Sequence, residues 1–369
     1  MNIAILGFGT VGSGVYDAAQ RTNGAVNVVR ILDLRTFAGF EQLLTSDIHH
    51  ITNDASIELV VETMGGVNPA YGYVMQSIEA KKHVVSANKQ LICEKYAALT
   101  GAAAENGVQL RFTASAGGGI PWLHNLRRAK RCDEIGEVSG IVNGTTNFIL
   151  DAMDRLGEDY GRALKSAQKL GYAEADPTAD VNGFDAQRKC AISASIAFDA
   201  IVEAEMVLTE GIQHFNQAAA SAARELPETK GRAVKLLMRA GRHEDGIYAY
   251  VAPALVRADS LEASVPSNYN LITLQAKYAG VQSFFGQGAG KDPTGTSVVQ
   301  DILDIVEGCG RGAPRAARPR VKNGGVERDF FIFDGERARI ERASVSAMFD
   351  YAGGERAKGK SVFFGEVAV

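Results

Sequence analysis

The sequence predicts an α/β protein, with a Rossmann-type doubly wound parallel sheet in its N-terminal part and an α+β domain after it. Three observations support this prediction. A glycine-rich turn joins the first strand to the first helix, strands and helices then alternate as far as residue 113, and further strands are expected within residues 271–286. Parallel strands need crossover helices, so the alternation indicates a parallel sheet, and the later strands give the second domain a sheet of its own.

The first strand, residues 2–6, is apolar and runs directly into GFGTVG, which is followed by the helical stretch VGSGVYDAAQ. A GxGxxG motif between a strand and a helix allows a tight turn and lets the backbone approach a pyrophosphate at the positive end of the helix. The alternative, a simple glycine turn, is disfavoured by this strand-to-helix context. We therefore expect these residues to contact a dinucleotide: Gly7, Phe8, Gly9, Thr10, Val11 and Gly12.

The second strand, residues 26–32, ends in Asp33, which lies 21 positions after Gly12. An acid at this distance and at a strand end can bind the adenosine ribose hydroxyls and would repel a 2′-phosphate. Arg35 stands two positions later and could instead attract that phosphate. The choice between NAD and NADP stays open, and the residues favour NAD.

Three later loops, ETMGG, ANK and SAGGGIP, each follow a strand, and the strands are expected at residues 58–61, 83–86 and 108–113. Ligands of parallel sheets bind at the carboxyl ends of strands, so we expect these loops to line one cleft. The plainer alternatives are a solvated surface lysine in ANK and a flexible glycine turn in SAGGGIP. The residues expected at the cleft are Thr63, Gly65, Ser86, Lys89 and Gly117 to Gly119.

The second domain begins with a strand at 137–142 that leads into NGTTNFIL. Its polar residues, 143–147, either cap the following helix or contact a substrate. A helix is predicted over 218–240, IYAYVAPALV is predicted as a strand, and two more strands are expected at 271–278 and 281–286.

The stretch LGYAEADPTADVNGFDAQRKCAISASIAF places several acids ahead of a single lysine, Lys189. Asp185 and Lys189 are four positions apart and share one face of a helix that is expected to start near Asn182. The residues after Lys189 are apolar or small on every side, which is typical of a buried helix. A buried ammonium needs partner carboxylates, and such a cluster suits a zwitterionic substrate whose proton must be moved. The alternative is an ordinary helix ion pair.

The sequence GQGAGKDPTGTSVVQDILDIV repeats the pattern of a glycine loop before a helix, here expected from near Thr294. This helix either packs back on the dinucleotide domain or simply ends a connection. The basic stretch RGAPRAARPR after it is predicted as a linker. The expected domains are 1–130, completed by a late segment at about 287–310, a substrate-binding and dimerisation domain at 131–286, and a linker with a short tail at 311–369.

Composition narrows the class of protein. The chain has 369 residues, a net charge of −4 and 46% hydrophobic residues, which is typical of a globular protein without a nucleic-acid footprint. Its four cysteines and six histidines show no disulfide or metal-ligand spacing. No apolar run approaches the length of a membrane span. We therefore expect a cytoplasmic protein with a small-molecule substrate and with neither nucleic-acid nor membrane partners.

Six blocks of the sequence, taken in order, resemble the homoserine dehydrogenase family. They are GFGTVG, ANK, SAGGGIP, GIVNGTTNFIL, GYAEADPTADVNGFDAQRK and GAGKDPT, and they cover about residues 1–310. The resemblance implies an NAD(P)-dependent oxidoreductase that interconverts L-homoserine and L-aspartate 4-semialdehyde on the route to threonine and methionine.

By position, the resemblance implies that Lys189 is the proton-transferring lysine with Asp185 beside it, and that Lys89 is the second active-site lysine. It also implies that Glu174 binds the substrate ammonium with help from Asp180. Lys189 would give the proton in the reducing direction while Lys89 polarises the carbonyl oxygen. The other expected contacts are Gly144 and Thr145 for the substrate and Gly290 for the cofactor.

The sequence departs from the family pattern in three places. Thr113 replaces a common glutamate that helps to hold a sodium ion, so only the backbone near Ala116, Gly118 and Ile120 remains for such an ion. Leu32 replaces an arginine before Asp33, which weakens the case for NADP. The tail is too short for the regulatory ACT domain of many members, so we expect no threonine feedback through one. The resemblance also implies a homodimer paired through the second domain.

Two other functions are compatible with the sequence. One is a dehydrogenase of another amino-acid-like substrate, and the other is a non-catalytic dinucleotide-binding regulator, because fold alone does not fix function. A sensor needs no proton-transfer pair, so Asp185 and Lys189 argue against the regulator. An aspartate-semialdehyde dehydrogenase would need a cysteine nucleophile, and no cysteine has a suitable context.

Overall fold

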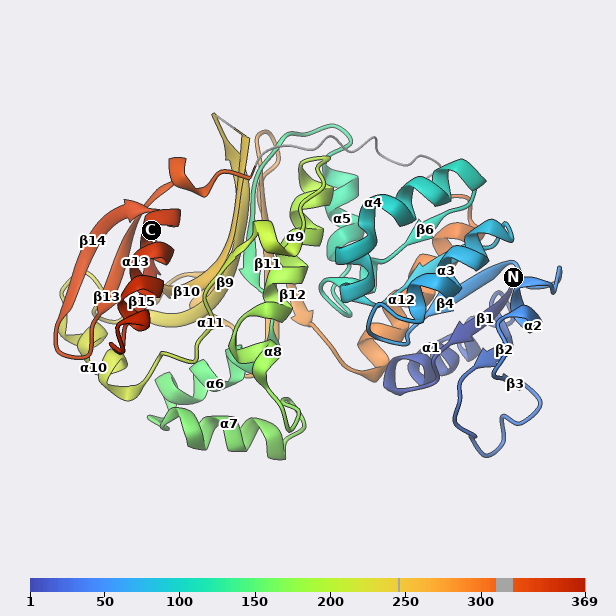
Figure 1. The fold of residues 1–369 in the computed structure, drawn as a ribbon, viewed down its shortest axis with the longest axis horizontal. Coiled ribbons are helices and arrows are strands. Elements are labelled where there is room, and N and C mark those ends of the chain that lie inside the picture. Colours follow the sequence, from blue (N-terminus) through green and yellow to red (C-terminus); the bar gives the residue numbers. More distant parts are fainter. Residues whose placement is uncertain (245, 310–320, 369) are drawn as a thin grey trace. The chain divides into compact units, whose positions relative to one another are not determined.

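The computed structural model describes residues 1–244, 246–309 and 321–368, which fold into two compact units (Figure 1). The first unit contains Met1–Arg127 and returns at Gln287, and the second contains Arg128–Gly286 and the C-terminal residues from 321. The basic stretch 311–320, predicted as a linker, lies outside the described residues.

The first unit is built on a sheet of parallel strands in the order β3-β2-β1-β4-β5-β6. The chain adds β2 and β3 on one side of β1 and then β4 to β6 on the other side. This order is the doubly wound arrangement predicted from the sequence, with its switch point between β1 and β4. The strands are β1 (Asn2–Leu6), β2 (Asn27–Leu32), β3 (Leu44–Thr45), β4 (Leu59–Glu62), β5 (His83–Ser86) and β6 (Leu110–Arg111). The helices are α1 (Thr10–Gln20), α2 (His49–Thr52), α3 (Ala70–Glu79), α4 (Lys89–Asn106), α5 (Trp122–Ala129) and α12 (Lys291–Val306), with a 3₁₀ turn at Thr113–Ser115.

The late helix α12 packs against α1 and completes the core of the first unit. Val298 and Ile302 of α12 lie in one apolar cluster with Val15 of α1. The two helices cross where a Cβ on either Gly14 or Gly295 would collide with the backbone of the other helix. The first of the two alternatives for this helix, packing back on the dinucleotide domain, is therefore the one observed.

The second unit contains a mixed sheet of nine strands among the described residues, in the order β12-β11-β7-β9-β10-β15-β13-β14, with β8 beside β10. The strands are β7 (Ile135–Ile141), β8 (Leu208–Thr209), β9 (Ala233–His243), β10 (Gly246–Val256), β11 (Tyr269–Ala276), β12 (Gly280–Gln287), β13 (Glu327–Phe333), β14 (Ala338–Ser344) and β15 (Phe363–Val367). The helices are α6 (Gly144–Arg155), α7 (Tyr160–Lys169), α8 (Thr178–Val181), α9 (Phe184–Ala197), α10 (Gln217–Glu225), α11 (Leu261–Ser264) and α13 (Val345–Ala357), with 3₁₀ turns at Ala204–Met206 and Asn323–Gly325.

The predicted helix over 218–240 is wrong in its second half. Helix α10 ends at Glu225, and residues from Ala233 form β9, which pairs along its whole length with β10 and also with β7. An apolar run such as AVKLLMRA has the same composition in a buried helix and in a buried strand, so periodicity could not separate them. The backbone amides and carbonyls of β9 instead form hydrogen bonds with its two neighbouring strands, β7 and β10.

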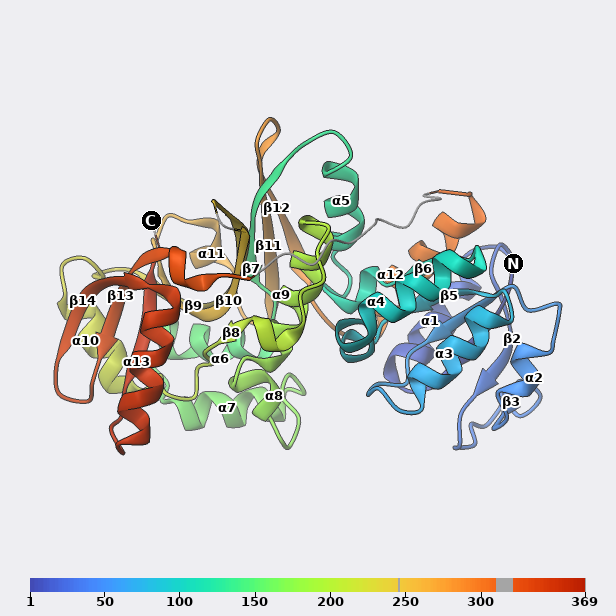
Figure 2. The same cartoon turned by 45° about the horizontal axis from the view of Figure 1, so that its top comes forward.

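The C-terminal residues, which the sequence analysis set apart as a short tail, form part of the second sheet (Figure 2). Strand β15 pairs with β10 on one side and with β13 on the other. Helix α13 covers this part of the sheet, where Met348 packs with Phe330, Phe364 and Tyr250 in one buried cluster. These strands and α13 therefore belong to the core of the second unit.

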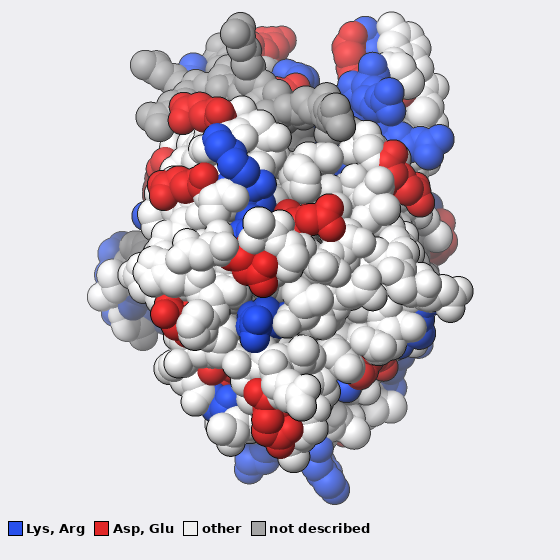
Figure 3. All heavy atoms as spheres, turned by 90° about the vertical axis from the view of Figure 1, so that its right-hand side faces the viewer, with Lys and Arg blue, Asp and Glu red and all other residues white. Residues whose placement is uncertain are grey.

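No helix in the described ranges is long and apolar enough to cross a membrane. On the face of the molecule shown in Figure 3, Lys and Arg residues are interspersed with Asp and Glu among the described residues.

Candidate active site

Helix α9 holds Lys189 in a buried position. The helix begins after Gly183, whose φ of +83° is a left-handed conformation that favours glycine. The Lys189 ammonium donates hydrogen bonds to Asp185 Oδ2 at 2.8 Å and to the carbonyl oxygen of Val142 at 2.6 Å, and its side chain is 9% exposed. The predicted ion pair between residues four positions apart is therefore present, and it lies inside the unit rather than on a solvated face.

Asn143 joins the two carboxylates that precede Lys189. Its side-chain amide donates to Asp180 Oδ1 at 2.7 Å and to Asp185 Oδ2 at 2.8 Å, while its carbonyl oxygen Oδ1 accepts from the amide of Thr146 and caps α6. Capping and substrate contact were the alternatives for residues 143–147. Asn143 caps α6 and also binds both carboxylates, while contact with a substrate stays a prediction. It was not among the predicted site residues, and its place at a strand-to-helix junction is the signal that could have identified it.

Asp180 lies between Asn143 and Thr145 at the same cluster. Burial raises the pKa of the Asp180 carboxyl, the Asp185 charge raises it further, and Asn143, Thr145 and Lys189 lower it in part. Thr145 Oγ1 lies 2.5 Å from the carbonyl oxygen of Tyr172 and 3.0 Å from Asp180 Oδ2. A hydroxyl has one hydrogen to donate, so Thr145 can donate to only one of these two oxygens at a time.

Glu174 and Gly144, which were also predicted to bind the substrate, lie in different surroundings. Glu174 is exposed on the loop between α7 and α8, and among the described contacts none joins its carboxylate to Asp180, Asp185 or Lys189. Gly144 begins α6, and a Cβ there would meet the carbonyl oxygen of Asn268 at 2.6 Å. Its glycine is explained by this close approach of a neighbouring loop.

The predicted dinucleotide turn is stabilised from inside the first unit. Gly7 has a φ of +87°, and a Cβ on Gly12 would collide with the carbonyl oxygen of Gly7. Thr63 Oγ1 donates to that same oxygen at 2.7 Å, so its hydroxyl supports the turn. A Cβ on Gly9 would meet only Arg35 Nη2 within 4 Å, at 3.9 Å, which leaves that side of the loop open. Phe8, in contrast, is buried among aromatic side chains.

Asp33 and Arg35 are bound to each other. The Arg35 guanidinium donates to Asp33 Oδ1 at 3.0 Å and to Oδ2 at 2.9 Å, and the backbone amide of Phe8 donates to Oδ2 at 2.8 Å. These contacts, the Arg35 side chain first, hold the pKa of Asp33 well below its usual range despite partial burial. The two residues that would favour different cofactors thus form one ion pair.

Glu62 connects the loops after β4 and β5, and it was missed in the sequence. It is fully buried and accepts hydrogen bonds from Ser86 Oγ at 2.6 Å, from the Met64 amide at 2.9 Å and from Asn88 Nδ2 at 3.1 Å. Asn88 in turn caps α4, whose first residue is Lys89. Burial raises the pKa of Glu62, and its hydrogen bonds oppose that shift. An acid at the end of the apolar strand ELVVE was the available signal.

The SAGGGIP loop packs against the loop before α12. A Cβ on Gly118 would collide with the backbone of Gly288, and the amide of Gly119 donates to the carbonyl oxygen of Gln287 at 3.1 Å. Thr113 donates from both its amide and its hydroxyl to Asp301 of α12, each at 2.8 Å. No group of three or more His, Cys, Asp or Glu side chains in the described residues could hold a metal ion.

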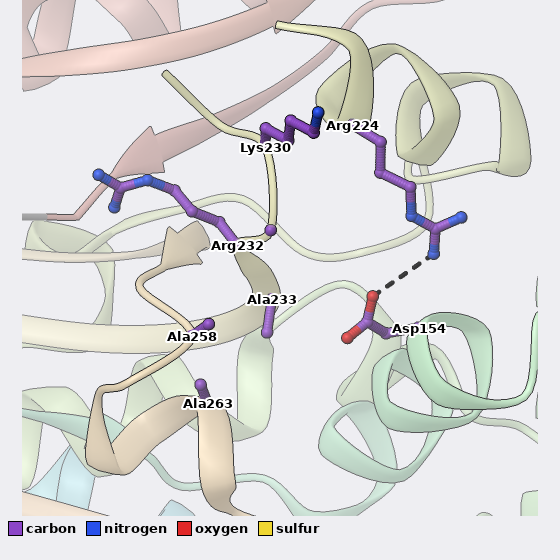
Figure 4. A pocket seen from close by; sticks show the side chains of 8 residues that line it. Asp154, Arg224, Lys230, Arg232, Ala233, Ala258 and Ala263 are labelled. Atoms are coloured by element: carbon purple, nitrogen blue, oxygen red, sulfur yellow. Dashed lines mark hydrogen bonds and ion pairs between the residues drawn. The ribbon is translucent and has the colours of Figure 1, made fainter. Parts of the chain in front are cut away.

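A pocket of about 470 Å³ in the second unit is separate from this cluster (Figure 4). It is lined by Asp154, Arg224, Lys230, Gly231, Arg232, Ala233, Ala258 and Ala263, none of them a predicted site residue. Asp154 lies near the C-terminal end of α6, about 16 Å along the helix from Asn143 at the other end.

A doubly wound unit with a dinucleotide turn, together with a unit that carries a buried lysine and carboxylates, defines the class of NAD(P)-dependent oxidoreductases. Residues 7–113 match the family model of the homoserine dehydrogenase NAD-binding domain, and residues 121–303 match that of homoserine dehydrogenase. The chain belongs to the homoserine dehydrogenase family. It acts on the CH–OH group of L-homoserine and interconverts it with L-aspartate 4-semialdehyde.

Individual relatives agree with this family. The chain is 40% identical over 320 residues to the homoserine dehydrogenase of Corynebacterium glutamicum, covering 82% of this chain and 71% of that one. It is 37% identical over 322 residues to the enzyme of Synechocystis sp., covering 83% and 73%. A crystal structure of a homoserine dehydrogenase from Thiobacillus denitrificans aligns with a TM-score of 0.88 at 29% identity, covering 100% of this chain and 98% of that one. The resemblance drawn from the six sequence blocks and the predicted fold class are confirmed.

Proposed function

We propose that Lys189 transfers the proton in this reaction and that Asp185 and the Val142 carbonyl hold its ammonium in place. The single observation that carries the proposal is the buried Lys189–Asp185 pair, at 2.8 Å, on a helix whose residues after Lys189 are apolar or small. The bound nicotinamide supplies or accepts the hydride. In the reducing direction the Lys189 ammonium gives its proton to the aldehyde oxygen as that oxygen becomes an alcohol.

Lys89 polarises the substrate oxygen in this proposal. It is the first residue of α4, where the positive end of the helix adds to the effect of its own charge on developing alkoxide. Asp180 receives the substrate ammonium together with Glu174, and Gly144 and Thr145 form the adjoining surface. Ser86, Gly65 and Gly290 complete the contacts proposed for the cofactor, beside the turn from Gly7 to Gly12.

For the cofactor, we propose a preference for NAD over NADP. Asp33 stays ionised because Arg35 lowers its pKa, and its charge repels a 2′-phosphate. Arg35 has its own charge balanced by Asp33 at 2.9 Å, so it attracts that phosphate less than an unpaired arginine would.

We further propose a homodimer that pairs through the second sheet. Strand β12 is at the edge of this sheet, and Tyr278, Val281 and Phe285 near or on it are 75%, 65% and 55% exposed. Burial of such apolar side chains at an edge strand would stabilise a dimer. Light scattering of the purified protein tests this, and a monomer at micromolar concentration would contradict it. We also propose a cytoplasmic location, supported by four cysteines that form no disulfide among the described residues.

We propose that any sodium ion is bound by the backbone near Ala116, Gly118 and Ile120 alone, because the Thr113 hydroxyl donates a hydrogen bond to Asp301 and supplies no carboxylate. Activity in sodium and in potassium buffers of equal ionic strength tests it. Equal rates would remove the ion from the proposal.

The function as a whole is tested by the absorbance of reduced nicotinamide when the purified protein meets L-homoserine with NAD and, separately, with NADP. We expect reduction of both with a higher kcat/KM for NAD. Dinucleotide binding without turnover in either direction would favour the regulator instead.

A further inference from the structure

The C-terminal segment, defined here as residues 321–368, contains none of the residues proposed for the reaction. We propose that this segment positions Lys189. It acts through the Arg356–Glu210 ion pair and through residues 209–212, which Glu210 holds against the turn before α9. The inference rests on the role proposed above for Lys189, and it gives a function to a segment that the sequence left without one.

Arg356 of α13 holds Glu210 in a two-point contact. The guanidinium nitrogens Nη1 and Nη2 donate to the two carboxylate oxygens of Glu210, each at 2.8 Å. Glu210 has a side chain that is 7% exposed, and its amide donates to the carbonyl oxygen of Val251 in β10 at 2.8 Å. The guanidinium also donates to the carbonyl oxygen of Val362. A buried carboxylate that loses a bidentate partner must move toward water or take up a proton, so this contact fixes residue 210.

Residues 209–212 form a wall against the turn 181–183, which joins α8 to α9. The amide of Ile212 donates to the carbonyl oxygen of Val181 at 2.7 Å. A Cβ on Gly211 would collide with that carbonyl, and a Cβ on Gly183 would meet Thr209 Cγ2 at 2.9 Å. No space is left between wall and turn, so a displacement of Glu210 is transmitted to the turn.

The turn 181–183 separates the two carboxylates of the site. Asp180 precedes it and Asp185 follows it, and Asn143 binds both at 2.7 and 2.8 Å. Because Asp185 is one of the groups that hold the Lys189 ammonium, a shift of the turn changes the position of the lysine as well.

A second set of contacts from the same segment supports the two strands, β9 and β10, that pack against α9. Glu366 of β15 accepts from Tyr250 at 2.9 Å and pairs with Arg239 at 3.0 Å. The Cys190 sulfur lies 3.6 Å from the carbonyl oxygen of Arg239 and 3.9 Å from that of Tyr250. Cys190 directly follows Lys189, so β15 braces the two strands that α9 contacts through Cys190.

The test is the variant Arg356→Met in the full chain, with Arg339→Met as its matched control. Arg339 belongs to the same segment, pairs with Glu341 and Asp334 and donates to the Tyr351 hydroxyl of α13 at 3.0 Å. The control therefore removes a contact of the same helix that has no described link to residues 209–212. We expect Arg356→Met to lower kcat about tenfold, because small displacements of a catalytic group have effects of this order or larger. The dissociation constant for NAD should stay at the wild-type value, as should both quantities in the control.

Hydrogen exchange supplies a second measurement that does not depend on activity. In Arg356→Met the amides of residues 178–190 should exchange faster than in the wild type, while those of β11 and β12 in the same unit keep their rates. Arg356→Lys, which retains the charge but not the two-point contact, should recover part of the lost kcat. If Arg356→Met does not fold, Glu210→Gln replaces it with the same expectations.

Two results would overturn the proposal. One is a kcat for Arg356→Met equal to that of Arg339→Met, and the other is faster exchange spread evenly over the second unit, which would indicate a loss of fold stability only. If the wild-type chain oxidises no homoserine, the proposed function fails, and the exchange data still decide whether the segment positions α9.

Discussion

The buried carboxylate of Glu62 accepts a hydrogen bond from the side-chain amide of Asn88, at 3.1 Å, and this contact joins two loops that follow neighbouring strands. The same amide donates to the carbonyl oxygen of Gly66 at 2.6 Å. Glu62 therefore fixes both the loop that follows β4, where the cofactor is proposed to bind, and Asn88, the residue before Lys89. This role does not require Glu62 to contact the cofactor or the substrate.

Glu62→Ala should reduce both stability and activity. Ser86, Asn88 and the Met64 amide would lose their acceptor, which costs on the order of 1–3 kcal/mol of unfolding free energy for each unpaired buried group, with partial relief by water. Urea denaturation measures the loss, and the KM for the dinucleotide should rise. The matched control is Glu58→Ala. Glu58 is exposed, and among the described contacts its carboxylate accepts a hydrogen bond only from the Asn2 amide. Equal unfolding midpoints for the two variants would refute the role given to Glu62.

Lys189→Met should abolish most of the turnover while the dinucleotide still binds. Loss of a positioned proton donor lowers rates by about 10²- to 10⁴-fold. Steady-state kinetics and fluorescence titration with NADH separate the two effects. Lys165→Met, which removes an exposed lysine from α7, serves as control and should leave kcat unchanged. Near-normal turnover in Lys189→Met would remove this residue from the mechanism.

Asp33→Ser should shift the cofactor preference toward NADP. The substitution removes the charge that repels a 2′-phosphate and frees the Arg35 guanidinium, which now binds Asp33 at two points. We expect the ratio of kcat/KM for NADP to that for NAD to rise about tenfold, or ~1.4 kcal/mol. In Asp33→Ser with Arg35→Ala the gain should disappear. A ratio that stays the same in both variants would show that this pair does not read the ribose.

Lys235 should make the stability of the protein depend on pH above 8. Its ammonium is buried and contacts Asn147 Oδ1 at 3.0 Å and the carbonyl oxygen of Val265 at 2.8 Å. Burial lowers the pKa of Lys235 to about 8 from an ordinary 10.5. Below pH 8 the folded and unfolded chains are both protonated here, and the cost of burying the charge is fully present. Above pH 8 the unfolded chain binds more protons, so stability rises with pH.

Urea denaturation at pH 7.5 and pH 9.5 tests this sign. The wild type should gain about 2 kcal/mol relative to Lys235→Met over this interval. Lys230→Met, which removes an exposed lysine of the neighbouring loop, should follow the wild type at both values. A constant difference between the wild type and Lys235→Met would show that the lysine does not titrate in this range.

The sequence was most informative where chemistry depends on neighbours along the chain. The pair of Asp185 and Lys189 follows from helical spacing, and the turn from Gly7 to Gly12 follows from a local motif, so both could be predicted. The partners of Glu62 and Asn143 could not be predicted, because they lie 26 and 42 positions away and only the strand order brings them together. For the same reason, the sequence did not predict the strand conformation of the apolar run of β9 or the place of the C-terminal strands in the second sheet. Both depend on the neighbouring strands that pair with them.

The crossing of α1 and α12 at Gly14 and Gly295 has a consequence for synthesis. These glycines lie 281 positions apart in the chain, so the apolar side of α1 leaves the ribosome long before the helix that covers it. Val15 and Ala19 of the nascent polypeptide therefore stay uncovered while residues 128–286, the larger part of the second unit, are translated. The second unit can therefore begin to fold before the first can finish, and chaperone binding is expected to concentrate on the first helix during that interval.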